Sequence, residues 1–151
     1  MQVNTIQAVL SDGARRLLLT SLEMADGIKN YGTLIAHHVT IAYRATSEQI
    51  ENIINTDGSI TLEDGLDVTI RVSKHVFDDD YGVEAVTAKV LTSTGAEVQS
   101  LNPNPHITIS IAPHRKPVDS NTLLDTMSDR LGDFVDVGLK LDAKIKFLYF
   151  K

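Results

Sequence analysis

The hydrophobic positions of the chain follow two different periods. Apolar residues alternate with polar ones in residues 66–73, 83–91 and 139–149, which is the pattern of strands with one buried face. Apolar residues recur every three to four positions in residues 12–22, 46–54 and 120–131, which is the pattern of amphipathic helices. Residues 5–10, residues 35–43 and the segment after Pro105 are predicted as further strands.

Capping residues mark the ends of the predicted helices. Ser11-Asp12 can cap the first helix, and Thr46 and Gln49 have the spacing of a capping box before the second. Asp119-Ser120 can cap the third helix, and Gly132 is expected to end it. Each helix therefore has a predicted start that does not depend on its apolar stripe.

The predicted order is strand, helix, strand, helix, three strands, helix, strand. Residues 78–82 form a turn signal between two alternating segments, which predicts an antiparallel hairpin. Such an order favours an α+β fold in which helices cover an antiparallel sheet. The 151 residues suffice for one domain with a sizeable core, so we expect a single domain over residues 1–151.

Two of the predicted strands contain the tripeptide His-x-Thr followed by isoleucine. Strand side chains alternate between faces, so His38 and Thr40 are expected on one face and their apolar neighbours on the other. His106 and Thr108 repeat this arrangement. One such tripeptide is common in strands, but two copies with matching apolar neighbours indicate a shared site.

Two imidazoles and two hydroxyls fit the cleavage of a phosphodiester bond. The reaction needs a base, an acid and donors to the charged phosphorus centre, and histidine titrates near neutral pH. Threonine hydroxyls can donate to the phosphate oxygens. No Asp or Glu lies in either tripeptide, so we expect no metal site and no cofactor.

Composition restricts the partners of the chain. A net charge of −6 disfavours tight binding to long nucleic acid, which depends on Lys and Arg. The absence of cysteine excludes disulfides and thiolate zinc sites. No stretch reaches the roughly 20 apolar residues of a membrane span. The start of the sequence lacks a signal-peptide pattern, so a cytoplasmic location is expected.

The two motifs, residues 38–41 and 106–109, resemble those of the two-histidine (2H) phosphoesterases. That family has His-x-Thr/Ser twice, on strands of two pseudo-symmetric lobes that face a central cleft. The resemblance implies a bilobal α+β fold, with helices packed outside antiparallel sheets, and metal-independent phosphodiester hydrolysis. It would make His38 and His106 the acid and the base, with Thr40 and Thr108 binding phosphate.

Within this family the short chain and residues 36–40 look most similar to phage anti-CBASS phosphodiesterases. These destroy cyclic oligonucleotide messengers of bacterial immunity. The resemblance implies a counter-defence enzyme that hydrolyses 3′-5′ bonds of a small cyclic nucleotide in the host cytoplasm. Two alternatives stay open: an RNA 2′,3′-cyclic phosphodiesterase or RNA-repair enzyme, and a protein that sequesters a nucleotide without cleaving it. The sequence leaves the acid and base assignment, the base-contacting residues and the oligomeric state open.

Other polar residues have simpler interpretations. His37 is expected on the opposite face of its strand from His38, and His75 is expected to face solvent beside the hairpin turn. Residues 78–80 and 114–116 are predicted as a polar turn and a solvated loop. The lysines expected on the exposed face of the last strand are Lys140, Lys144 and Lys146. The tyrosines that could stack on a base are Tyr31, Tyr43 and Tyr81.

Overall fold

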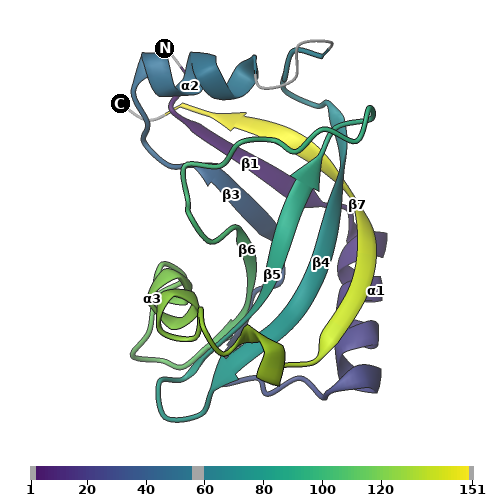
Figure 1. Cartoon of the computed structure of the whole chain (residues 1–151), viewed down its shortest axis with the longest axis vertical. Coiled ribbons are helices and arrows are strands. Elements are labelled where there is room, and N and C mark those ends of the chain that lie inside the picture. Colours follow the sequence, from purple (N-terminus) through teal and green to yellow (C-terminus); the bar gives the residue numbers. More distant parts are fainter. Residues whose placement is uncertain (1–2, 56–59, 150–151) are drawn as a thin grey trace.

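A computed structural model of the chain describes residues 3–55 and 60–149 (Figure 1). The helices are α1 (Asp12–Ala25), α2 (Ser47–Ile54), α3 (Asp119–Thr126) and the short 3-10 helix η1 (Leu131–Asp133). The strands are β1 (Thr5–Leu10), β2 (Thr33–Leu34), β3 (His38–Ala42), β4 (Asp67–Asp78), β5 (Val83–Leu91), β6 (His106–Ile111) and β7 (Asp136–Leu148).

The element order agrees with the sequence prediction except at residues 35–43. Of the strand expected there only β3, residues 38–42, is present, and the short strand β2 precedes it at residues 33–34. Ala36 lies between them with a φ of 49°, a left-handed conformation that interrupts the ladder. The motif strand β3 therefore begins at His38 itself, where the chain re-enters the sheet.

All strand pairs are antiparallel, and the sheet closes on itself. The strands follow the order β2-β6-β3-β1-β7-β4-β5, and β5 pairs in addition with β6. Six strands thus form a barrel, with β2 attached to β6 outside the ring. The α+β class is confirmed, whereas two pseudo-symmetric lobes with a central cleft are not seen, because the pairing of β5 with β6 makes the sheet continuous.

The helices lie on different sides of this barrel. Figure 1 shows α1 beside β7, α3 on the opposite side of the molecule and α2 at one end. The side chains of Leu18 and Leu22 in α1 and of Ile50 and Ile53 in α2 join the main hydrophobic core. Leu17, expected in the same stripe, is instead 49% exposed.

The capping predictions hold for two helices and are wrong for the third. The hydroxyl of Ser11 accepts a hydrogen bond from the backbone N–H of Ala14, and the capping box of α2 is complete. At α3 neither predicted residue caps the helix. Asp119 accepts from the backbone N–H of Lys116 in the preceding turn. Gly132 lies within η1 rather than at the end of α3.

The apolar backs of both motifs are buried, as the alternation of side chains predicts. Val39 and Ile41 of β3 are 0% and 1% exposed, and Ile107 and Ile109 of β6 are fully buried. All four belong to the same core cluster as α1 and α2. Burial of this face fixes the orientation of both strands, so their histidines and threonines lie on the other face. Within the described residues, no helix is long and apolar enough to cross a membrane.

Candidate active site

The register between β3 and β6 brings the two motifs together. Val39 and Ile107, the middle residues of the two tripeptides, are cross-strand partners. On either side of this pair, the histidine of one motif therefore lies across from the threonine of the other. Side chains in such positions have Cβ atoms about 5 Å apart. The four predicted site residues thus form one group on one face of the sheet.

The ring of His38 is contacted through both nitrogens. Its Nε2 lies 3.1 Å from the hydroxyl of Thr40 and 3.3 Å from Nε2 of Gln7, which projects from the neighbouring strand β1. Its Nδ1 lies 2.9 Å from Nδ1 of His37. The prediction that His37 lies away from His38 is therefore wrong, because the chain bends at Ala36 before β3 begins.

Burial, with smaller contributions from the neighbouring His37 and His106, lowers the pKa of His38 from 6.5 to about 4. Loss of water disfavours the charged imidazolium, and two nearby imidazoles disfavour it again. The contribution of His106 reflects the proximity of the two motif histidines. His38 is therefore neutral at neutral pH, with a lone pair on one ring nitrogen.

His106 has a different environment from His38. Its Nδ1 donates a hydrogen bond to the backbone carbonyl of Asn104 at 2.7 Å. A carbonyl oxygen can only accept, so the Nδ1 proton is fixed and Nε2 carries the lone pair of the neutral ring. Burial lowers the pKa of His106, while the bond to Asn104 opposes this effect because it stabilises the protonated ring.

Helix α3 holds the second motif at two points. The hydroxyl of Thr108 lies 2.8 Å from that of Ser120 and also donates to the carbonyl of Pro117 at 3.4 Å. Thr108 is 8% exposed and Ser120 is fully buried. Near the other end of the helix, Asp125 accepts a hydrogen bond from the side chain of Asn104, whose carbonyl holds His106. The helix therefore orients both polar residues of the motif.

Three of these contacting residues were not singled out in the sequence. Gln7 is a polar residue among the buried side chains of β1. The sequence shows this, but only the register of β1 against β3 shows that Gln7 lies beside His38. The sequence predicts Ser120 only as a cap, and Asn104 only precedes the second motif strand. Their roles depend on how α3 packs against the barrel.

A buried ionic network lies beside the motif face. His75 is fully buried, which corrects the prediction that it faces solvent. Its Nδ1 lies 2.8 Å from Asp26 and its Nε2 lies 2.6 Å from Glu84, which also accepts from Ser110 of β6. Burial alone would raise the pKa of Glu84, but hydrogen bonds from His75, the backbone N–H of Lys29 and Ser110 together lower it.

The loop after β6 is only partly exposed to solvent. His114 and Lys116 are exposed, as predicted for a solvated loop. Arg115 is instead partly buried, because its guanidinium lies 3.7 Å from the ring centre of Tyr81 and donates to the carbonyl of that residue.

The remaining tyrosines differ in their surroundings. The hydroxyl of Tyr31 donates to Asp79, and burial raises the pKa of Tyr31. Among the three tyrosines considered for stacking, Tyr43 is the most exposed, at 63%. The lysines on the exposed face of β7 are Lys140, Lys144 and Lys146.

No cluster of three or more His, Asp or Glu side chains in residues 3–55 and 60–149 could hold a metal ion. The polar atoms closest to the two motif histidines are amide, hydroxyl, imidazole and carbonyl groups. These groups can exchange protons and donate hydrogen bonds, which is the chemistry of acid–base catalysis.

Comparisons with known proteins found one family model and a solved structure with a similar fold. The model of the family described as fungal tRNA ligase phosphodiesterase domain matches residues 29–139, which include both His-x-Thr motifs. The crystal structure of a fungal RNA kinase has a similar fold, with a TM-score of 0.67 and 15% sequence identity. The similarity covers 99% of this chain and 46% of the solved chain, so this chain spans about half the length of that protein. No curated protein matches. Because the family model covers more than half of the chain, the chain belongs to the family of fungal tRNA ligase phosphodiesterase domains.

Proposed function

We propose that this domain hydrolyses 2′,3′-cyclic phosphates at RNA ends, with His38 and His106 as proton-transfer groups. The observation that carries the proposal is the register of β3 against β6, which groups two imidazoles and two hydroxyls on one face. Membership in a family of tRNA ligase phosphodiesterase domains supports the substrate class. Thr40 and Thr108 would donate hydrogen bonds to the non-bridging phosphate oxygens.

The proposed reaction is the attack of water on the phosphorus atom. One imidazole Nε2 takes a proton from the water while its oxygen forms the new P–O bond. The bond from phosphorus to one ribose oxygen breaks, and the second imidazole gives a proton to that oxygen. The product is a phosphomonoester beside a free ribose hydroxyl. Both proton transfers use groups of the chain itself, so the mechanism requires no metal ion.

The surroundings of the two rings favour His38 as the base and His106 as the acid. The lowered pKa of His38 keeps its ring neutral, and the amide group of Gln7 beside its Nε2 can donate to the lone pair. The carbonyl of Asn104 stabilises the protonated form of His106. A bound phosphate anion would also raise the pKa of His106, since an opposite charge favours the imidazolium.

The cyclic-oligonucleotide function, which was the leading prediction from the sequence, uses the same four residues. It is the weaker candidate because the description of the matched family names a tRNA ligase phosphodiesterase domain and no phage enzyme. The net charge of −6 is compatible with either substrate, since a short RNA end needs few phosphate contacts. Because both candidate functions use the same chemistry, only the substrate that the protein cleaves distinguishes them.

The test is a substrate panel assayed with a chelator present. RNA oligonucleotides ending in a 2′,3′-cyclic phosphate are compared with cyclic dinucleotides and cyclic trinucleotides. We expect turnover of the RNA ends, and cleavage of only the cyclic oligonucleotides would overturn the proposal. Binding of the RNA ends without any product after long incubation would instead identify a sequestering protein.

Single variants assign the chemistry to the two motifs. His38→Ala and His106→Ala are each expected to reduce turnover by about 10²–10⁴-fold, the usual contribution of a general acid or base. His114→Ala removes an exposed histidine outside the motifs and serves as the matched control. Thermal unfolding of all three proteins checks that the fold persists. Near-normal turnover in either motif variant would remove that histidine from the mechanism.

A further inference from the structure

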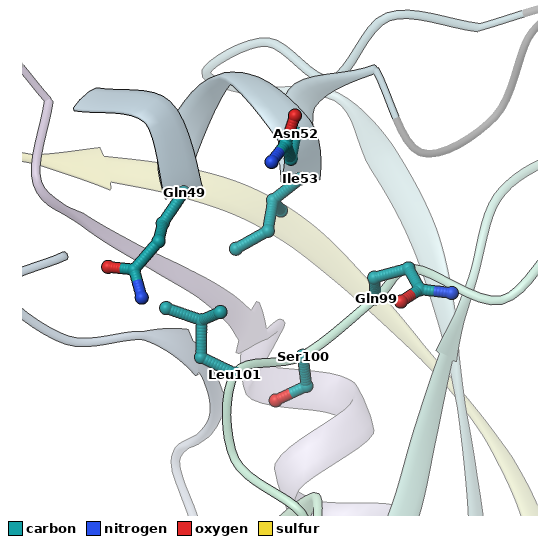
Figure 2. A pocket seen from close by; sticks show the side chains of 6 residues that line it. All are labelled: Gln49, Asn52, Ile53, Gln99, Ser100 and Leu101. Atoms are coloured by element: carbon teal, nitrogen blue, oxygen red, sulfur yellow. The ribbon is translucent and has the colours of Figure 1, made fainter. Parts of the chain in front are cut away.

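A cavity of about 340 Å³ lies between α2 and the segment that leads from β5 to β6. Figure 2 shows Ile53 of α2 and Leu101 of the segment pointing toward each other across it, with the carboxamide of Gln49 beside them. The cavity therefore has two apolar walls and a polar rim. The residues that line it are Gln49, Asn52, Ile53, Gln99, Ser100 and Leu101.

One wall of this cavity is attached to the first motif strand. The backbone N–H of Leu101 donates to the carbonyl of Ile41 at 2.9 Å, and the hydroxyl of Ser100 donates to the same oxygen at 3.3 Å. Ile41 directly follows Thr40 in β3. From Leu101 a short stretch of chain leads to His106, the start of the second motif. The cavity wall is thus joined by hydrogen bonds to one motif strand and leads along the chain to the other.

The side chains around the cavity select an uncharged, planar, polar ligand. Three carboxamides carry both donors and acceptors, and no charged residue lines the cavity. A phosphate would require Lys or Arg nearby, whereas a nucleobase presents apolar faces and an edge of donors and acceptors. Ile53 and Leu101 would contact the faces of such a base, and the amides would contact its edge.

One of the amides is already held in place in the free protein. Oε1 of Gln49 accepts a hydrogen bond from the backbone N–H of Thr46 at 2.9 Å, as part of the capping box of α2. This bond fixes the direction of the carboxamide and leaves Nε2 as a donor. A donor that is positioned before binding loses less entropy when the ligand arrives, which favours specific recognition.

We propose that this cavity binds one of the last two nucleobases of the RNA substrate while the terminal phosphate lies between the motifs. The proposal rests on the proposed function for the identity of the substrate. A chain with a net charge of −6 cannot rely on phosphate contacts along a long backbone. Holding a base beside the reacting end gives affinity and selectivity without such contacts.

The test measures binding and turnover separately. Fluorescence anisotropy reports the affinity of the full chain for trinucleotides ending in a 3′-phosphate, with all bases intact or with the last or penultimate base removed. The kcat/KM values are measured on matching trinucleotides with 2′,3′-cyclic ends. The double variant Asn52→Ala/Gln99→Ala truncates two exposed amides of the rim. Glu51→Gln, on the same helix but outside this cavity, is the control.

We expect removal of one base to weaken binding by the wild type and the control about fivefold or more, a typical effect of lost contacts to a base edge. The double variant should bind intact and abasic RNA alike. Equal binding of both RNAs by the wild type would overturn the base-binding proposal, whether or not cyclic ends are cleaved. Base-dependent binding that the double variant loses, without cleavage of any cyclic end, would keep this proposal and overturn the proposed function.

Discussion

At the scale of single residues, the two motif histidines are chemically unequal although their tripeptides are alike. His106 donates from Nδ1 to a carbonyl, while Nδ1 of His38 contacts another imidazole. The sequence identifies both rings, because the repeated tripeptide and the alternation of a strand place them on one face. It could not rank them as acid and base, because the contacts that differ come from Gln7, His37 and Asn104.

The first prediction concerns the pH dependence of catalysis. Burial and the neighbouring imidazoles lower the pKa of His38 from 6.5 to about 4, and burial lowers the pKa of His106. The reaction requires one neutral and one protonated ring, so the active fraction of the free enzyme falls as the pH rises above the higher of the two values. We expect kcat/KM for RNA cyclic ends to be maximal below pH 6.5. A maximum above neutral pH would contradict the lowered pKa values of both histidines.

The second prediction concerns the hydroxyl of Ser120. Its bond to Thr108 orients a group that would donate to phosphate, so Ser120→Ala should lower kcat/KM for RNA cyclic ends about tenfold, as expected for one misplaced hydrogen bond. Thr122→Ala, an exposed position on the same helix, should leave kcat/KM unchanged. If Ser120→Ala changes only the melting temperature and not kcat/KM, the residue has a purely structural role.

At the scale of elements, local sequence signals predict a helix start well where the cap is built from adjacent residues. Ser11 and Thr46 cap their helices because the partner N–H groups lie three residues along the chain. Helix α3 differs because the hydroxyl of Ser120 is hydrogen-bonded to that of Thr108, and Asp119 accepts a hydrogen bond from the preceding turn. The competing partners are close only after folding, so the sequence predicts the helix but not its cap.

The third prediction tests the capping box of α2. Thr46→Ala removes the hydroxyl that accepts from the backbone N–H of Gln49, and should lower the free energy of unfolding by about 1 kcal/mol. Thr46→Ser keeps this hydroxyl and should behave like the wild type. Urea denaturation followed by circular dichroism measures both effects. Equal stability of Thr46→Ala and Thr46→Ser would show that the box contributes nothing measurable.

At the scale of the whole molecule, ring closure and a buried ionic network connect parts of the chain that are distant in sequence. His75 of β4 and Glu84 of β5 face each other in the interior, and Asp26 at the end of α1 contacts the same imidazole. Glu84 also accepts from the backbone N–H of Lys29 and of Asn30. The network thus joins the loop after α1 to β4 and β5 and, through Ser110, to β6, which carries the second motif.

The fourth prediction compares a buried ion pair with an exposed one. Glu84→Gln removes the buried carboxylate that contacts His75 and should lower the free energy of unfolding by about 3 kcal/mol. Asp67→Asn breaks the bond to Lys144, where both side chains are mostly exposed, and should cost under about 1 kcal/mol. Chemical denaturation of both variants gives the two values. A cost for Glu84→Gln no larger than that for Asp67→Asn would show that the network is not a stabilising element.

The sequence by itself determined the class of the fold, most of the helices and strands, and the four residues of the paired motifs. These follow from periodicity and capping, which act between residues close in the chain. Only the tertiary structure decided that the barrel closes through β5 and β6, that His75 is buried, and that Gln7 and Ser120 contact the motifs. Those features depend on strand register and on helix packing, which join residues far apart in the sequence and leave no local pattern.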